Sequence, residues 1–361
     1  MKKIAIVGAG NAGCLTALHY HFWEKDNLDK ITIYHDPDIP IEKVGQGSAL
    51  GVTDLLFNAL NIDFVENNPI KATLKSGIMY ENWGKRDMFH NFPLSRMGCH
   101  YVPSLLSDVV LNSGLFNVIE KKIEDPEEEI DSDWIFDCRG KTHKGKRKKL
   151  NNPINSVLLA KKPGNDPTLT YTRCVATPDG WTFIIPNHDS VSYGYLFNNT
   201  ITTSEEASKN FTEMFDVVSE SEINFENYIE RNIWHGKRTC LNGNRLSFLE
   251  PLEASSTGFH LYTARESWDH IIGGKPKADC NLSVQEEMKR IENFVLWHYE
   301  AGSKFDTPFW EYTKKFQPVE DIRLEYFKDF VSESGHIEQL KLMQDYSQWS
   351  PYSINKWMSV F

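Results

Sequence analysis

A glycine-rich turn directly after an apolar run is the feature that most constrains how this chain can fold. The run covers residues 3–7, and Gly8-Ala9-Gly10-Asn11-Ala12-Gly13 follows it. Beyond the turn, Leu15, Leu18 and Phe22 recur at helical spacing. In a strand–turn–helix unit of this kind, backbone N–H groups and the helix N-terminus bind a pyrophosphate. The segment therefore predicts a dinucleotide-binding α/β fold, with binding residues Gly8, Gly10, Ala12 and Gly13.

An acidic residue follows the next apolar strand at a distance suited to a ribose. The strand is expected at residues 31–34, and Asp36 stands 23 residues beyond Gly13. An acid about 20 residues after such a turn commonly binds a ribose hydroxyl. Asp36 is therefore a candidate cofactor ligand. The run Asp36-Pro37-Asp38 fits a turn after the strand equally well, so both interpretations stay open.

Composition indicates a soluble globular protein of one large or two ordinary domains. The chain has 361 residues, 40% of them apolar, and no stretch long enough to span a membrane. Six cysteines form no CxxC pair. We therefore expect reduced thiols, a cytoplasmic location and no structural metal.

Charge argues against nucleic acid as a partner. The formal net charge is −11 at pH 7, whereas nucleic-acid binders present clustered cations to phosphates. One basic segment, Lys141–Lys149, stands out. A solvated loop is the expected explanation, and docking of an acidic carrier protein is the alternative.

Two further motifs accompany the glycine turn. They are Gly180-Trp181-Thr182-Phe183-Ile184-Ile185-Pro186 and Phe248-Leu249-Glu250-Pro251-Leu252-Glu253. In this order the three motifs resemble the flavin-dependent halogenases related to tryptophan halogenase, and the resemblance extends over roughly residues 1–315. It implies an α/β protein with a Rossmann-like FAD-binding domain of the FAD monooxygenase type and a substrate module of strands and C-terminal helices. The implied FAD domain is discontinuous, at 1–83, 100–150 and 232–265, and the substrate module comprises 151–231 and 266–361.

The resemblance also places the rest of the flavin site. Asp133–Gly140 resembles a segment that closes over the adenine half of FAD, with Arg139 replacing a serine of the family pattern. Val44–Ser48 resembles the segment beside the flavin, with Gln46 replacing a glutamate. The implied cofactor residues in these segments and in the turn before Phe248 are Gly45, Gln46, Ser48, Asp137, Gly140, Gly243 and Asn244.

For the chemistry, the resemblance points to a lysine and a glutamate. Asn82-Trp83 sets the register in favour of Lys75 over Lys71 as the residue that holds or activates hypohalous acid. The second carboxylate of Glu-Pro-Leu-Glu implies Glu253, with Glu250 as competitor, as the group that accepts the proton of the substituted ring. A surface lysine and a first-turn glutamate at a helix N-terminus are the structural alternatives. Backbone N–H groups near Ser255 and Ser256 are the predicted halide site.

Trp181, Phe183 and Pro186 match the part of the family that lines the passage between flavin and substrate. Phe183 stands where the family has a second tryptophan, so an aromatic wall is kept while an indole N–H is lost. The alternation of Trp181 and Phe183 also predicts a half-buried strand ending at Pro186.

The resemblance implies an enzyme that uses FADH2 from a separate flavin reductase, O2 and a halide ion. Its substrate would be an electron-rich aromatic of the indole, phenol or pyrrole type. Since only residues 84–99 separate Trp83 from the next matched segment, we expect a pocket that is open to a larger or carrier-bound substrate, or is completed by a second subunit of a homodimer. A flavin-dependent monooxygenase or oxidase without halide chemistry is the alternative function, and an idle flavin-binding protein is a third. No membrane partner is expected.

Overall fold

The computed structural model describes residues 1–318 except 25, 27, 85–86, 93–96, 142–144 and 167. Residues 319–361 of the expected substrate module therefore lie outside the described residues, as do residues 142–144 of the basic segment. Among the described helices, none is long and apolar enough to cross a membrane.

A six-stranded sheet carries the glycine turn. Its order is β17-β18-β9-β1-β2-β8, and every pairing is parallel except β17 with β18. Because parallel strands end at a common edge, the turn after β1 lies beside the turns that follow β2 and β9. The strands are β1 (Ile4–Val7), β2 (Thr32–His35), β8 (Asn117–Glu120), β9 (Trp134–Asp137), β17 (Trp234–His235) and β18 (Thr239–Leu241).

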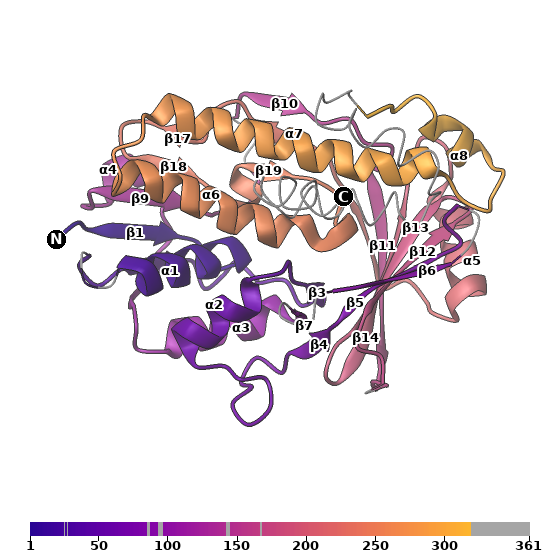
Figure 1. Cartoon of the computed structure of the whole chain (residues 1–361), viewed down its shortest axis with the longest axis horizontal. Helices are drawn as coiled ribbons and strands as arrows, with labels where there is room; N and C mark the ends of the chain where they lie inside the picture. The colour runs from indigo at the N-terminus through magenta and orange to yellow at the C-terminus, as the bar shows by residue number, and fades with distance from the viewer. Residues whose placement is uncertain are drawn as a thin grey trace, which may run out of the picture.

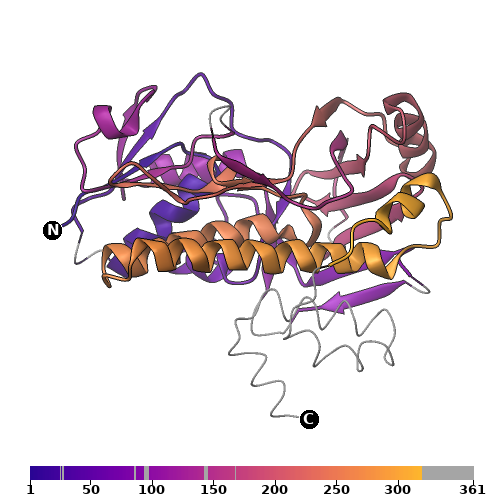
Figure 2. The ribbon, with the colours of Figure 1, turned by 90° about the horizontal axis from the view of Figure 1, so that it is seen from above.

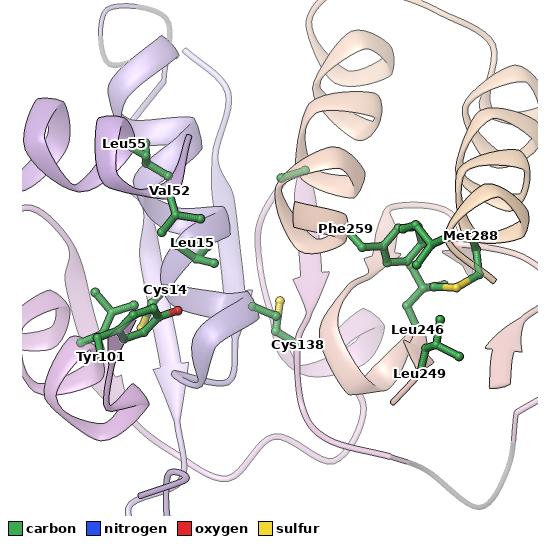
Figure 3. Packing of buried hydrophobic residues seen from close by; sticks show 14 of the residues in the cluster. Cys14, Leu15, Val52, Leu55, Tyr101, Cys138, Leu246, Leu249, Phe259 and Met288 are labelled. Carbon is green, nitrogen blue, oxygen red and sulfur yellow. The ribbon is translucent and has the colours of Figure 1, made fainter. Parts of the chain in front are cut away.

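Helices from both ends of the chain pack around this sheet. Helix α1, which starts directly after the glycine turn, packs against α6, α2 and α3. Figure 3 shows Leu15 of α1 beside Val52 and Leu55 of α2, and Phe259 of α6 beside Met288 of α7. The helices are α1 (Asn11–Glu24), α2 (Val52–Leu60), α3 (Pro103–Asn112), α4 (Pro126–Glu129), α6 (Ser255–Ile271) and α7 (Lys277–Ala301).

A seven-stranded sheet in the order β15-β11-β14-β13-β12-β5-β6 forms the second half of the molecule (Figure 1). Its neighbours are antiparallel except β12 with β5. The strands are β5 (Gly77–Glu81), β6 (Met88–Asn91), β11 (Ser156–Pro163), β12 (Thr172–Thr177), β13 (Gly180–Pro186), β14 (Ser190–Phe197) and β15 (Ser221–Asn224).

Both faces of the seven-stranded sheet are covered. Helix α5 (Ser204–Phe215) places Ala207 and Phe211 on one face, against Tyr195 and Phe197. The other face, with Val157 and Leu196, lines a cavity toward the first sheet. The expectation of a half-buried strand at Gly180–Pro186 is therefore wrong: every residue of β13 is buried, because it is an inner strand between two covered faces.

Two small sheets connect these halves, in the orders β3-β7-β4 and β10-β16-β19. Their strands are β3 (Gln46–Gly47), β4 (Thr73–Lys75), β7 (Gly98–Tyr101), β10 (Arg147–Lys149), β16 (Tyr228–Glu230) and β19 (Ser247–Phe248). The expected domain division differs from the sheet pairing at two points. Strand β10, in the expected FAD domain, pairs with β16, in the expected substrate module. Residues 77–81, placed in the FAD domain by that division, form β5 and pair with β12 of the seven-stranded sheet.

Helix α7 runs along both halves of the molecule (Figures 1 and 2). Near its start, the carbonyl of Lys277 accepts a hydrogen bond from the indole of Trp234 at 3.2 Å. At its other end it packs against α8 (Pro308–Thr313), whose Trp310 donates to the carbonyl of Thr177 in β12. The expected boundary at 265/266 falls inside α6, which packs against α1 and α7.

Candidate functional site

The glycine turn has the geometry that a bound dinucleotide requires. Gly8 has φ +105°, a conformation that favours glycine. A Cβ at Gly13 would lie 1.9 Å from the carbonyl oxygen of Gly8, so the third glycine permits close packing of helix on turn. At Gly10, by contrast, a Cβ would meet nothing within 4 Å. The second glycine therefore leaves its backbone open to a ligand at the N-terminus of α1.

A cavity of about 1150 Å³ begins at this turn and extends to the seven-stranded sheet. It is larger than the roughly 300–1,000 Å³ typical of small-ligand sites, and the open backbone at Gly10 lies on its wall. The residues present therefore fit FAD. The predicted site residues that line the cavity are Gly8, Gly10, Ala12, Asp36, Gly45, Gln46, Lys75, Gly140, Trp181, Phe183, Asn244, Glu253, Ser255 and Ser256.

Five predicted residues do not line the cavity but stand behind it: Gly13, Ser48, Asp137, Pro186 and Gly243. Ser48 is buried, and its carbonyl accepts a hydrogen bond from Lys75 Nζ at 3.3 Å. The carbonyl of Pro186 accepts from the hydroxyl of Thr73 at 2.6 Å. Gly243 has φ +63°, and a Cβ there would meet that of Ala12 at 2.5 Å. These residues support the site through packing and backbone contacts.

Asp137 holds two arginines instead of facing the cavity. It is buried, and both Arg139 Nη2 and Arg245 Nε lie 2.9 Å from its Oδ2. Arg139, which replaces the serine of the family pattern, lines the cavity together with Gly140. The structure therefore gives Asp137 a position from which it orients a cation on the cavity wall.

Asp36 combines the two interpretations that the sequence left open. Its Oδ1 accepts a hydrogen bond from the backbone N–H of Asp38 at 3.0 Å, which forms the turn after β2. The residue also lines the cavity next to the glycine turn. A turn residue at this edge of the sheet is thus still placed for the ribose contact, which stays a prediction.

Gln46, which replaces the glutamate of the family pattern, sits in a network of side chains. Its Oε1 accepts from Asn11 Nδ2, and its Nε2 donates to Glu42 Oε2 at 2.7 Å. The hydroxyl of Tyr101 donates to Asn11 Oδ1 at 3.1 Å. The network ties residues 42–46 to the first turn of α1, on the cavity wall.

Lys75 is a buried cation on the cavity wall. It ends β4, is 1% exposed and stands 5.4 Å from the centre of the Phe92 ring. Burial lowers the pKa of the Lys75 ammonium, and the charge of Glu253 opposes that shift. The surface-lysine alternative is thereby excluded for Lys75. Lys71 instead forms an exposed ion pair with Asp189.

Glu253 is held in a strained backbone conformation. It has φ +67° and Ala254 has φ +54°, values that non-glycine residues rarely adopt. Its side chain is buried, lines the cavity, and contacts Nε2 of His298 in α7 at 3.2 Å. Ser255 and Ser256 follow at the start of α6 and also line the cavity. The alternative, a glutamate in the first turn of α6, is not observed, because Glu253 lies in the short 3-10 segment Leu252–Ala254 that precedes α6.

Glu250, the competing carboxylate, does not line the cavity and is completely buried. Its oxygens accept from Asn152 Nδ2 at 2.5 Å, Trp181 Nε1 at 2.7 Å and the Tyr299 hydroxyl at 2.8 Å. Burial raises the pKa of Glu250, and these donors oppose the rise. The structure therefore separates the two glutamates, with Glu253 facing the cavity and Glu250 behind it.

Trp181 and Phe183, named here the tunnel wall, project from β13 onto the cavity side with ring centres 6.3 Å apart. Phe183 lies over Gly194 of β14, where a Cβ would meet the ring at 2.1 Å. Beside them, Cys174 also lines the cavity, and burial raises the pKa of its thiol to about 12.

Sequence reasoning missed several residues around the site: Glu42, Asn152, Arg245, His298 and Tyr299. Most of their side-chain contacts join residues 45–218 positions apart, so local patterns gave no sign of them. The adjacent pair His298-Tyr299 was visible only as part of a predicted helix. All six cysteines are free and buried, and the described residues contain no cluster of three or more His, Cys, Asp or Glu arranged to hold a metal ion.

Fold and site together define an α/β protein of the FAD monooxygenase type. The family model described as tryptophan halogenase matches residues 3–107 and 98–360. The chain therefore belongs to the tryptophan halogenase family, and it is an enzyme of the flavin-dependent halogenase class.

Similarity to individual members extends over most of the chain. Tryptophan 7-halogenase RebH of Lentzea aerocolonigenes is 22% identical over 430 aligned positions, which cover 90% of this chain and 81% of that protein. The solved structure of MibH, a tryptophan 5-halogenase, matches with a TM-score of 0.79 at 18% identity, covering 98% of this chain and 83% of that one. A flavin-dependent halogenase from Xanthomonas campestris matches with a TM-score of 0.77 at 18% identity, covering 99% and 94%. The structural matches establish the shared fold.

Proposed function

We propose that this enzyme uses FADH2, O2 and a halide to halogenate an electron-rich aromatic substrate through Lys75 and Glu253. The observation that carries the proposal is that these two residues line one cavity and interact electrostatically. They are 178 positions apart in the chain, both are buried, and both line the cavity that begins at the glycine turn. A buried, oppositely charged pair in a cavity is a common arrangement in active sites.

Different residues along the cavity would serve different steps of the reaction. The open backbone at Gly10 and the N-terminus of α1 would bind the pyrophosphate of FAD. Reduced flavin and O2 would supply the oxidising power that converts a halide to hypohalous acid. Trp181 and Phe183 would then keep the substrate away from the flavin, so that only the small oxidant passes the tunnel wall.

Lys75 would hold the hypohalous acid and make its halogen electrophilic. An ammonium donates to the oxygen of the acid and polarises the halogen–oxygen bond, whereas a neutral amine would capture the halogen as a haloamine. Burial favours the neutral form and Glu253 favours the ammonium. The ring would gain the halogen, and the hydroxide of the acid would take a proton from the Lys75 ammonium and leave as water. The ring proton would pass to the Glu253 carboxylate, from which it can return to the Lys75 amine.

The test is product mass spectrometry with reduced FAD, O2 and bromide on a panel of indoles, phenols and pyrroles. The parent enzyme should give a bromine isotope doublet, and Lys75→Ala should abolish it while flavin reoxidation continues. Lys71→Ala, four residues away on an exposed ion pair, is the matched control. Normal bromination by Lys75→Ala would remove that residue from the mechanism.

A flavin-dependent monooxygenase is the second candidate, and Gln46 is the observation that favours it. An amide replaces the family's glutamate on the cavity wall, in contact with Asn11 and Glu42. Gain of oxygen without halogen in the same experiment would select this function. A separate flavin reductase as the source of FADH2 belongs to the main proposal, because no second glycine fingerprint for a nicotinamide cofactor is visible in the sequence.

A further inference from the structure

The polar atom of the tunnel wall is the indole nitrogen of Trp181, which is anchored behind the cavity. The indole N–H of Trp181 can only donate a hydrogen bond, and its acceptor is Oε2 of Glu250 at 2.7 Å. Phe183, the other residue of the wall, has no polar atom and is seated by shape over Gly194. The orientation of the Trp181 ring therefore depends on where the Glu250 carboxylate is held.

Two further side chains hold that carboxylate in place, and a third holds the backbone of Glu250. Asn152, before β11, donates to Oε1, and the Tyr299 hydroxyl of α7 lies 2.8 Å from both oxygens. The backbone N–H of Glu250 donates to Asn227 Oδ1 at 2.9 Å. With Trp181, side chains from three separate segments thus converge on one buried group.

Helix α7 contacts the two glutamates through two different residues. Its adjacent residues His298 and Tyr299 contact Glu253 and Glu250, respectively. Nδ1 of His298 lies 2.8 Å from the carbonyl of Phe294, which can only accept, so this nitrogen carries a proton and Nε2 faces Glu253. One helix therefore fixes both the carboxylate on the cavity wall and the carboxylate behind it.

We propose that Glu250 is a positioning residue that fixes the indole of Trp181 across the passage between the flavin part of the cavity and Lys75. This inference rests on the proposed function for what the passage separates. Glu250 acts only through Trp181, since it does not line the cavity and its oxygens already face fixed donors.

The first test measures the hydrogen bond between Trp181 and Glu250 directly and needs no reaction. In protein labelled with ¹⁵N-tryptophan, the Trp181 indole resonance is assigned by its loss in Trp181→Phe. Glu250→Gln should move that resonance upfield, because a hydrogen bond to a charged acceptor is replaced by one to a neutral amide. Glu253→Gln, the same change three residues on, is the matched control and should leave it in place. An unmoved resonance in Glu250→Gln overturns the proposal.

The second test measures coupling, as halogenated product formed per flavin oxidised. Glu250→Gln should lower this ratio by about tenfold, the change expected for a lost charged hydrogen bond, while flavin reoxidation keeps its rate. Because Glu250 acts through Trp181, the double variant Trp181→Phe/Glu250→Gln should be no worse than Trp181→Phe alone. A double variant that is markedly worse would give Glu250 a separate role and overturn the inference.

If Glu250→Gln does not fold, a milder variant tests the same hydrogen bond. Tyr299→Phe removes one donor from Glu250 and leaves its bond to Trp181, so it should shift the indole resonance less than Glu250→Gln does. An equal or larger shift contradicts the proposed anchor. If the parent enzyme forms no halogenated product, the proposed function fails, while the indole resonance still decides the positioning role.

Discussion

The two ends of the cavity differ in the atoms that form them. At the glycine turn the backbone makes the site, and the side chains there are absent or small. At the Lys75–Glu253 end, buried charged side chains make the site, held by contacts between segments far apart in the chain. The comparison teaches that the proposed cofactor end is specified by local geometry, whereas the proposed reactive end depends on long-range contacts that keep ionisable side chains out of water.

The largest effect is expected at the backbone end. In Gly13→Ala the new Cβ would lie 1.9 Å from a backbone oxygen that cannot move aside, so the turn and helix α1 must separate. We expect destabilisation by more than about 3 kcal/mol and loss of flavin binding. Chemical denaturation and flavin titration measure the two.

Gly10→Ala is the matched control at the same turn. Nothing lies within 4 Å of its Cβ, so stability should change by less than about 0.5 kcal/mol while flavin affinity falls, because the methyl group occupies the open side of the backbone. Equal losses of stability in the two variants would contradict the assignment of Gly13 to packing and of Gly10 to the ligand side.

At the side-chain end, Glu253→Gln should lower the halogenation rate by about 10²-fold or more, since an amide cannot accept the ring proton. The fold should persist, because the amide fits the same space beside His298. Single-turnover product formation gives the rate, and Glu250→Gln distinguishes loss of the base from loss of the anchor. A rate within twofold of the parent would show that another group takes the proton.

The tunnel wall between the two ends is tested by Gly194→Ala. A methyl group would meet the Phe183 ring at 2.1 Å and push it from its seat toward the cavity. We expect a loss of about 1–3 kcal/mol in stability and weaker halogenation. The double variant Gly194→Ala/Phe183→Leu should recover stability. If it does not, the backbone rather than the ring is the obstacle.

The smallest effect is expected at Ala254, where the Lys75–Glu253 end of the cavity depends on an unusual backbone conformation. Ala254 has φ +54°, which costs an L-residue about 1–2 kcal/mol, whereas glycine adopts it freely. Ala254→Gly should therefore raise the free energy of unfolding by up to about 1 kcal/mol after the added entropy of the unfolded chain is subtracted. Denaturant titration measures it, with Ala207→Gly, in the middle of α5, as a control that should be destabilised.

Local patterns predicted the parts of the fold and site that local geometry determines. Short motifs predicted the glycine turn and helix α1. The resemblance to the halogenases, not local geometry, singled out Lys75 and Glu253, which both line the cavity. Burial of β13 was not, because alternation along one strand does not reveal that α5 covers the far face. Pairing of β5 with β12 was missed for the same kind of reason, since residues about 94 positions apart meet only in the sheet.

The different positions of the two glutamates were the feature that the sequence revealed least. Glu250 and Glu253 stand in the same motif, and nothing in their immediate neighbours separates them. Their partners Tyr299 and His298 are 49 and 45 residues further along and become neighbours only when α7 packs across both halves. Asp137 is similar, because Arg245, one of the two arginines it holds, is 108 residues away.

Burial of the cavity wall also affects how well such an enzyme would resist oxidation. Cys174 lies on the wall along which a strong oxidant would travel, and thiolates are the form that oxidants attack. Burial raises the pKa of this thiol to about 12, which keeps it protonated and slow to react. The burial that lowers the pKa of Lys75 thus also keeps a neighbouring thiol in its unreactive form, and hydration of the wall would make that thiol easier to oxidise.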